Sequence, residues 1–106
     1  MKEKQMLVIV KRPGCEPEIE PLMPNELAAL QDWVGGKIET VTVASGCVVI
    51  CNEEARIKGL TYNCKFCGME CYGPLMLAGR KGDEFCSIKG SKIPFLLKSL
   101  RGGVDK

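Results

Sequence analysis

Three cysteines that lie close together in the sequence are the residues best suited to chemistry. Cys64, Cys67 and Cys71 are separated by two and three residues, and Gly68 follows the second of them. Two thiolates spaced in this way can chelate one zinc ion, and the glycine permits the tight turn of a zinc knuckle. Structural zinc sites close at four ligands, so a fourth thiolate must come from elsewhere. The candidates for it are Cys47, Cys51 and Cys86.

Two features of the sequence weigh against this zinc site. A second Cys-x-x-Cys pair is absent. If residues 64–72 form one regular strand, Cys64 and Cys67 point to opposite faces and cannot share an ion. The alternative is that the cysteines are free thiols that act as small apolar core residues. A thioredoxin-like redox pair is a weaker alternative, because its strand–helix context is missing.

The remaining residue types do not indicate catalysis. The chain contains no histidine, which removes the commonest general base and the usual partner of a nucleophilic Ser or Cys. Its two Gly-Gly pairs lack the rest of a phosphate-binding motif. We therefore expect a protein that is not an enzyme, with no cofactor unless the cysteines bind zinc.

Length and composition indicate one globular domain spanning residues 1–106, with 45% hydrophobic and 26% charged residues. The formal charge of +2 gives no basic surface of the kind that nucleic-acid binding requires. We find no secretory signal and no apolar segment of the roughly 20 residues that span a bilayer. We therefore expect a cytoplasmic protein without membrane contact, in which seven cysteines are free thiols or metal ligands.

The first half of the chain combines strands with one helix. An apolar run predicts a central strand at residues 5–11, and Pro17 and Pro21 make residues 15–22 either an edge strand or an extended arm. Residues 24–34 predict a helix capped by Asn25 and ended by two glycines.

The second half is richer in strands. We predict strands at residues 38–43 and 47–51, and the second continues through a turn into a return strand at residues 56–58. A further hairpin joins residues 74–78 and 84–88, and a final helix runs from a cap at Ser91 to about Leu100. Residues 101–106 are expected to be a flexible tail. The order β-β-α-β-β-β-β-β-α indicates an α+β domain with a mostly antiparallel sheet and two helices.

Three segments resemble a family of small proteins. They are GGKIE at residues 35–39, VVICNEEARIKGLTYN at residues 48–63 and YGPL at residues 72–75. The chain is similar from Met6 to Leu97 to the family called domain of unknown function 3846, whose members are carried by phages, plasmids and conjugative elements, mainly of Firmicutes. Cys67 and Cys71 occupy positions that are often apolar in relatives, which argues against a zinc site.

The resemblance implies a mobile-element setting and supplies no reaction. We expect a small binding or regulatory protein with an anti-defence role, which caps a host or element protein or sequesters a small ligand. The alternative is a zinc-stabilised interaction module, and the sequence leaves a homodimer open. On the resemblance, the expected contact residues are Gly36, Glu39, Asn52, Glu53, Glu54, Arg56 and Asn63. The alternative for each of them is a structural role in a turn.

Overall fold

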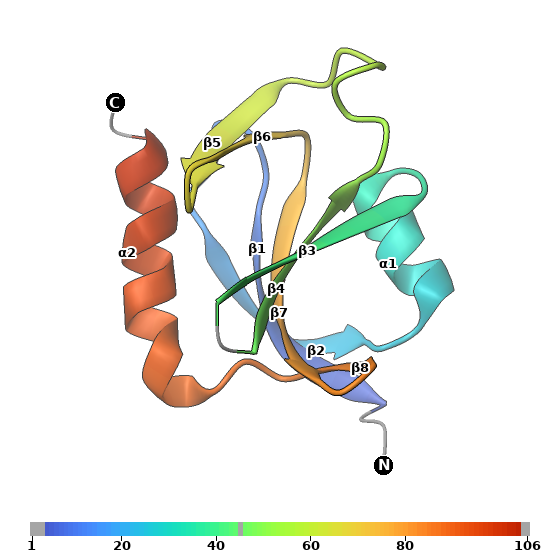
Figure 1. Ribbon diagram of the computed structural model, residues 1–106, viewed down its shortest axis with the longest axis vertical. Coiled ribbons are helices and arrows are strands. Elements are labelled where there is room, and N and C mark those ends of the chain that lie inside the picture. Colours follow the sequence, from blue (N-terminus) through green and yellow to red (C-terminus); the bar gives the residue numbers. More distant parts are fainter. Residues whose placement is uncertain (1–3, 45, 105–106) are drawn as a thin grey trace.

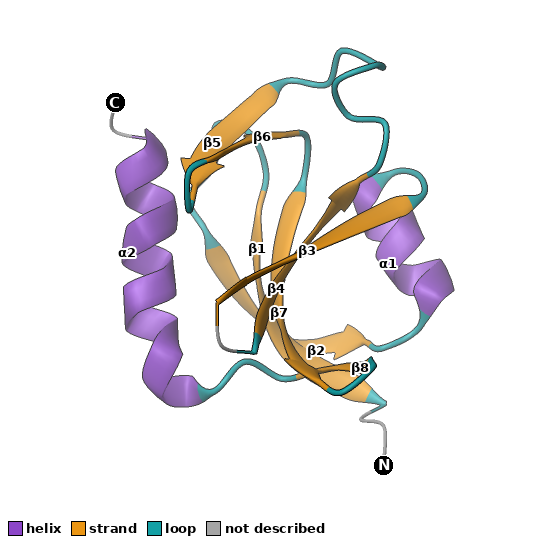
Figure 2. Ribbon diagram, in the orientation of Figure 1, coloured by secondary structure: helices purple, strands orange, loops and turns teal. Residues whose placement is uncertain are grey.

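An antiparallel sheet forms the centre of the molecule (Figures 1 and 2). The structure is a computed structural model that describes residues 4–44 and 46–104. In these residues the main sheet has six strands in the order β2-β1-β7-β4-β3, and β8 also pairs with β7. Their bounds are Gln5–Lys11 (β1), Glu18–Pro24 (β2), Ile38–Ala44 (β3), Cys47–Asn52 (β4), Leu75–Lys81 (β7) and Glu84–Cys86 (β8).

The other elements cover the two faces of this sheet (Figure 1). They are α1 (Leu27–Val34), the hairpin of β5 (Tyr62–Phe66) and β6 (Met69–Tyr72), a 3-10 turn (Gly90–Lys92) and α2 (Ile93–Val104). Successive side chains of a strand point to opposite faces, so β4 contributes to two cores. Val48 and Ile50 pack under α1, whereas Cys47 and Val49 pack under the hairpin and α2.

The predicted fold class is confirmed. The domain is α+β with a mostly antiparallel sheet and two α-helices. The apolar strands β1 and β4 each have two neighbours, and the proline-containing β2 lies at the edge of the sheet, as their sequences predict. Gly35 ends α1 in the left-handed conformation at φ 84°. Neither described helix is long and apolar enough to cross a membrane.

The predicted return strand at residues 56–58 is wrong. Residues 53–59 are turns with hydrogen bonds inside the segment, from Lys58 N to Glu54 O at 2.9 Å and from Gly59 N to Arg56 O at 3.1 Å. Asn52 Oδ1 accepts the Glu54 N–H at 2.8 Å and so begins this turn. Both edges of β4 are already paired, with β3 and β7, so the returning chain has no edge of β4 to join.

A hairpin over residues 62–72 was not predicted. Its two-residue loop places Cys67 at φ 51° and Gly68 at φ 80°, which are the values of a type I′ turn. Residues 64–72 are therefore not one strand, and Cys64 is the cross-strand partner of Cys71.

Two predicted helix caps are also wrong. The residue at the N-cap of α1 is Glu26, while the Asn25 side chain donates instead to Phe85 O at 3.0 Å. Ser91 lies inside the 3-10 turn that precedes α2. The final helix continues to Val104, past the expected end at Leu100, and residues 105 and 106 lie outside the described residues.

Candidate functional site

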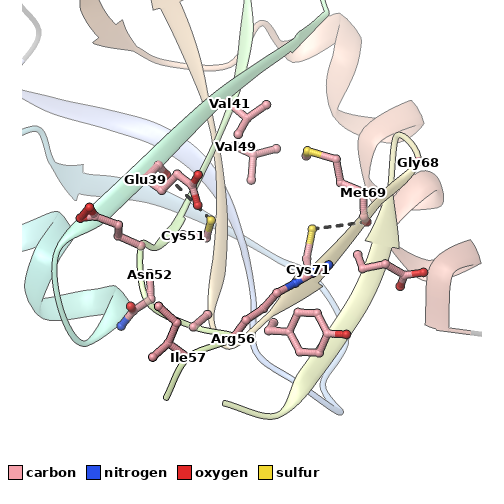
Figure 3. A pocket seen from close by; sticks show the side chains of 14 residues that line it. Glu39, Val41, Val49, Cys51, Asn52, Arg56, Ile57, Gly68, Met69 and Cys71 are labelled. Carbon is pink, nitrogen blue, oxygen red and sulfur yellow. Dashed lines mark hydrogen bonds between the residues drawn. The ribbon is translucent and has the colours of Figure 1, made fainter. Parts of the chain in front are cut away.

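A groove of about 470 Å³ lies between strands β3 and β4, the turn after β4 and strand β6 (Figure 3). α2 packs against β5, and β6 forms the outer strand of the hairpin beyond it. The lining includes residues of β6 and none of β5, so the groove borders the side of β6 that has no strand partner. The lining residues are Glu39, Val41, Val49, Cys51, Asn52, Glu53, Ala55, Arg56, Ile57, Gly68, Met69, Glu70, Cys71 and Tyr72.

The floor of the groove is apolar because two paired strands turn the same face toward it. Val41 lies opposite Val49, and Glu39 lies opposite Cys51, in the β3–β4 register. Figure 3 shows Val41 and Val49 facing Met69 of the hairpin. The turn after β4 forms the remaining rim, on which Ile57 is 85% exposed.

The rim carries more negative than positive charge. Three carboxylates line the groove, those of Glu39, Glu53 and Glu70, against the single guanidinium of Arg56. The Arg56 guanidinium lies over the Tyr72 ring at 5.0 Å, a cation–π contact. Within the described part of the chain, Glu39, Glu53 and Arg56 form no ion pair with a protein side chain.

A tyrosine pair supports the outer wall. The Tyr62 and Tyr72 rings meet edge to face, with centroids 5.3 Å apart. The Tyr62 hydroxyl donates to the Glu70 carboxylate, and this hydrogen bond is the main cause that raises the Tyr62 pKa to about 12. The Tyr62 ring therefore holds in place the Tyr72 ring that the Arg56 guanidinium contacts.

Two thiols face the groove from opposite sides. Burial, followed by the charge of Glu39, raises the Cys51 pKa to about 11. The Cys71 thiol donates to Met69 O at 3.7 Å, and its interaction with the Cys64 thiol across the hairpin raises the pKa of Cys71 and lowers that of Cys64. Cys51 and Cys71 are therefore neutral at physiological pH, and as thiols they offer the groove weak polar contacts and not an activated nucleophile.

Comparison with known proteins bears on the whole domain. The sequence profile of the family described as domain of unknown function (DUF3846) matches residues 5–100. The chain belongs to the DUF3846 family. No curated protein and no solved structure matches it.

In this DUF3846 protein, four of the seven expected contact residues line the groove: Glu39, Asn52, Glu53 and Arg56. Asn52 has a structural role, because it is 3% exposed and donates to Val34 O at the end of α1 at 3.2 Å. Gly36 lies behind it, and a Cβ at Gly36 would come within 2.9 Å of Asn52 Nδ2.

The other two expected residues, Glu54 and Asn63, do not line the groove. Glu54 pairs with Lys58 at 3.3 Å, four residues along the same turn. Asn63 is buried, accepts from Lys11 Nζ at 2.7 Å and donates to Gly73 O at 2.7 Å. Glu54 is therefore part of the turn, and Asn63 is part of the core.

The candidate zinc ligands are brought together only in part. Cys64 and Cys71 face each other across the hairpin, whereas Cys67 is exposed at its tip and Cys86 lies on β8. The described residues contain no group of three or more His, Cys, Asp and Glu side chains placed to hold a metal ion. Zinc binding therefore stays a prediction, and the described residues do not supply a set of ligands for it.

The apolar half of the groove is not among the contacts that the sequence predicts. For Val41 and Val49 the sequence predicts strands, and for Ile57 a return strand, with no contact role for any of the three. Tyr72 lies in a segment that resembles the family, yet it was not singled out. An isoleucine between two charged residues, Arg56 and Lys58, is the signal that could have indicated an exposed apolar contact.

A second pocket, of about 540 Å³, lies at the start of α2. Cys47 and Cys86 line it together with Lys81, Lys89 and Lys92, and none of the seven expected contact residues does so. We therefore take the first groove as the candidate site.

Proposed function

We propose that this protein is a non-catalytic binding protein whose partner or ligand occupies the groove between the β3–β4 face and β6. The observation that supports this proposal is the combination at one place of Ile57, which is 85% exposed, with the side chains of Glu39, Glu53 and Arg56, which form no ion pair among the residues that the structure describes. A large apolar side chain that is mostly exposed to water is stabilised when a partner buries it.

The rim charges serve the same role. Unpaired charges around an apolar floor add specificity and speed to association, because they attract a complementary partner and disfavour others. In the mobile-element setting that the resemblance implies, the captured molecule is a host or element protein or a small ligand, and its capture serves an anti-defence or regulatory purpose.

The test compares molecules retained by wild-type protein and by a groove variant, Arg56→Glu with Ile57→Asp. Both positions are exposed, so we expect the variant to fold. The matched control is Phe95→Asp, which also removes an exposed apolar side chain (71% exposed) but on α2. The proteins are expressed in a natural host and analysed by native mass spectrometry.

We expect wild type and Phe95→Asp to retain the same defined molecule and the groove variant to lose it. If wild type retains nothing, or if the groove variant retains the same molecule to the same extent, the proposed function is wrong.

A further inference from the structure

We infer that the groove takes an extended peptide segment of a partner protein, which pairs as a new strand with the open edge of β6 and carries Lys or Arg beside apolar residues. This inference rests on the proposed function and names the chemistry of the partner.

The open edge of β6 provides backbone groups for such pairing. In the type I′ turn, Phe66 and Met69 are the pair that exchanges hydrogen bonds next to the loop. Pairs in an antiparallel ladder alternate, so the next pair, Lys65 and Glu70, does not exchange bonds. The N–H and C=O of Glu70 therefore point away from β5, on the groove side of the hairpin.

The surface beneath that edge suits a strand. α2, β5 and β6 form the layer that covers this face of the sheet, and the layer stops at β6, before it covers β3 (Figure 1). A strand added to β6 would extend this layer by one position over Val41 and Val49. Side chains of an extended peptide alternate, so every second residue would point to that floor and the others to the rim.

The charge of the groove rim determines which charged residues the peptide should carry. The rim contributes the carboxylates of Glu39, Glu53 and Glu70, while the guanidinium of Arg56 faces the Tyr72 ring. Alternate side chains of the peptide that reach the rim therefore meet mostly negative charge, which favours Lys or Arg. The same charge disfavours acidic peptides and the phosphates of nucleic acids.

The experiment is a selection from a displayed library of random dodecapeptides. Enriched peptides are synthesised, and their affinities are measured by fluorescence anisotropy at low and high salt. The acidic rim is tested with Glu39→Gln/Glu53→Gln, and the matched control is Glu18→Gln/Glu84→Gln, which removes two exposed carboxylates outside the groove. Strand pairing is tested by N-methylation of single peptide amides and by hydrogen exchange of the Glu70 amide.

We expect peptides in which apolar residues alternate with Lys or Arg. The Glu39/Glu53 variant should bind them about tenfold more weakly at low salt, and the control variant should bind them like wild type. N-methylation at alternate amides should abolish binding, and bound peptide should slow exchange of the Glu70 amide.

Other results would overturn the inference and separate it from the proposed function. Peptides that need Arg56 and Ile57 but tolerate N-methylation, or that leave Glu70 exchange unchanged, would refute strand pairing and leave the groove as a binding site. Enrichment of acidic peptides, or no enrichment, would refute the stated partner chemistry. Peptides that bind the Arg56→Glu/Ile57→Asp variant as tightly as wild type would contradict the proposed function as well.

Discussion

At the residue scale, Lys11 and Asn63 show how a polar pair can connect the two layers of the fold. Lys11 is 1% exposed, and its ammonium donates to Asn63 Oδ1. Asn63 Nδ2 donates to Lys11 O at 2.9 Å, so the Asn63 side chain of β5 bonds both the ammonium and the backbone carbonyl of Lys11. A buried charge is tolerated only when its donors are bonded, so Asn63 is required by the core.

We predict that Asn63→Ala lowers the free energy of unfolding by about 3 kcal/mol, because it leaves a buried ammonium without this acceptor. Urea denaturation followed by circular dichroism measures this. The double variant Lys11→Met/Asn63→Leu removes both polar partners and should recover part of the loss. A loss below about 1 kcal/mol for Asn63→Ala would show that water replaces the amide.

Cys67 carries conformational strain that an asparagine would relieve. It stands at φ 51°, where Asn followed by Gly is the favoured pair of a type I′ turn. We predict that Cys67→Asn raises the free energy of unfolding by about 1 kcal/mol, measured by thermal denaturation.

The same variant tests the zinc hypothesis. If Cys67 is a zinc ligand, Cys67→Asn will destabilise the protein, and a chelator will lower the melting temperature of wild type only. An unchanged wild-type melting temperature in chelator, with a more stable variant, would instead support an exposed turn residue.

At the scale of elements, the join between β7 and the segment after β8 depends on the absence of a side chain. An ideal Cβ at Gly79 would lie 2.6 Å from Ser87 O and 3.0 Å from Cys86 Sγ. The first of these is a backbone atom, which cannot move aside as a flexible side chain can. This close approach holds the β8 segment against the sheet before the chain enters α2.

We predict that Gly79→Ala lowers the free energy of unfolding by about 1–3 kcal/mol, because the added methyl group displaces the backbone of residues 86–87. Gly90→Ala is the matched control, since a Cβ there meets nothing within 4 Å. Chemical denaturation of both variants gives the comparison. If both variants change the free energy of unfolding by the same amount, the close contact between Gly79 and Ser87 O does not explain the loss in Gly79→Ala.

At the scale of the whole molecule, cysteines concentrate between the sheet and its second layer. Cys47, Cys64 and Cys71 belong to the core on the α2 face, and Cys51 lies at its margin in the groove. Burial raises the pKa of Cys47 and that of Cys51, the latter from its ordinary 9.0 to about 11. The folded protein therefore holds these protons more tightly than the unfolded chain does.

We predict that the protein loses stability as the pH rises from 9 to about 11, because the unfolded chain releases the Cys51 proton first. The stabilisation that comes from the raised Cys51 pKa is fully present below pH 9. Cys51→Ala should flatten this part of the profile, whereas Cys15→Ala, which removes an exposed thiol, should not. Urea denaturation at several pH values measures the slopes, and parallel profiles for wild type and Cys51→Ala would contradict the prediction.

Local patterns in the chain were sufficient for the class of the fold and for most of its elements. The apolar runs at β1 and β4 predicted central strands, the prolines of residues 15–22 predicted an edge, and Gly35 predicted the end of α1. Each depends on the conformation or burial that the residue itself prefers, which acts over a few positions. The exposed charges Glu39, Glu53 and Arg56 were candidate contacts only through the resemblance to the family, and no local pattern indicated them.

The tertiary structure decided which of these residues share a site. Asn63 belongs to the core and not to the rim because Lys11, 52 residues away, takes its amide as an acceptor. Cys64 meets Cys71 because a turn at residues 67–68 folds the segment into a hairpin. The groove exists because the hairpin and α2 cover only part of one face of the sheet. Layer width and strand register depend on contacts between distant segments, and no local pattern of residues contains them.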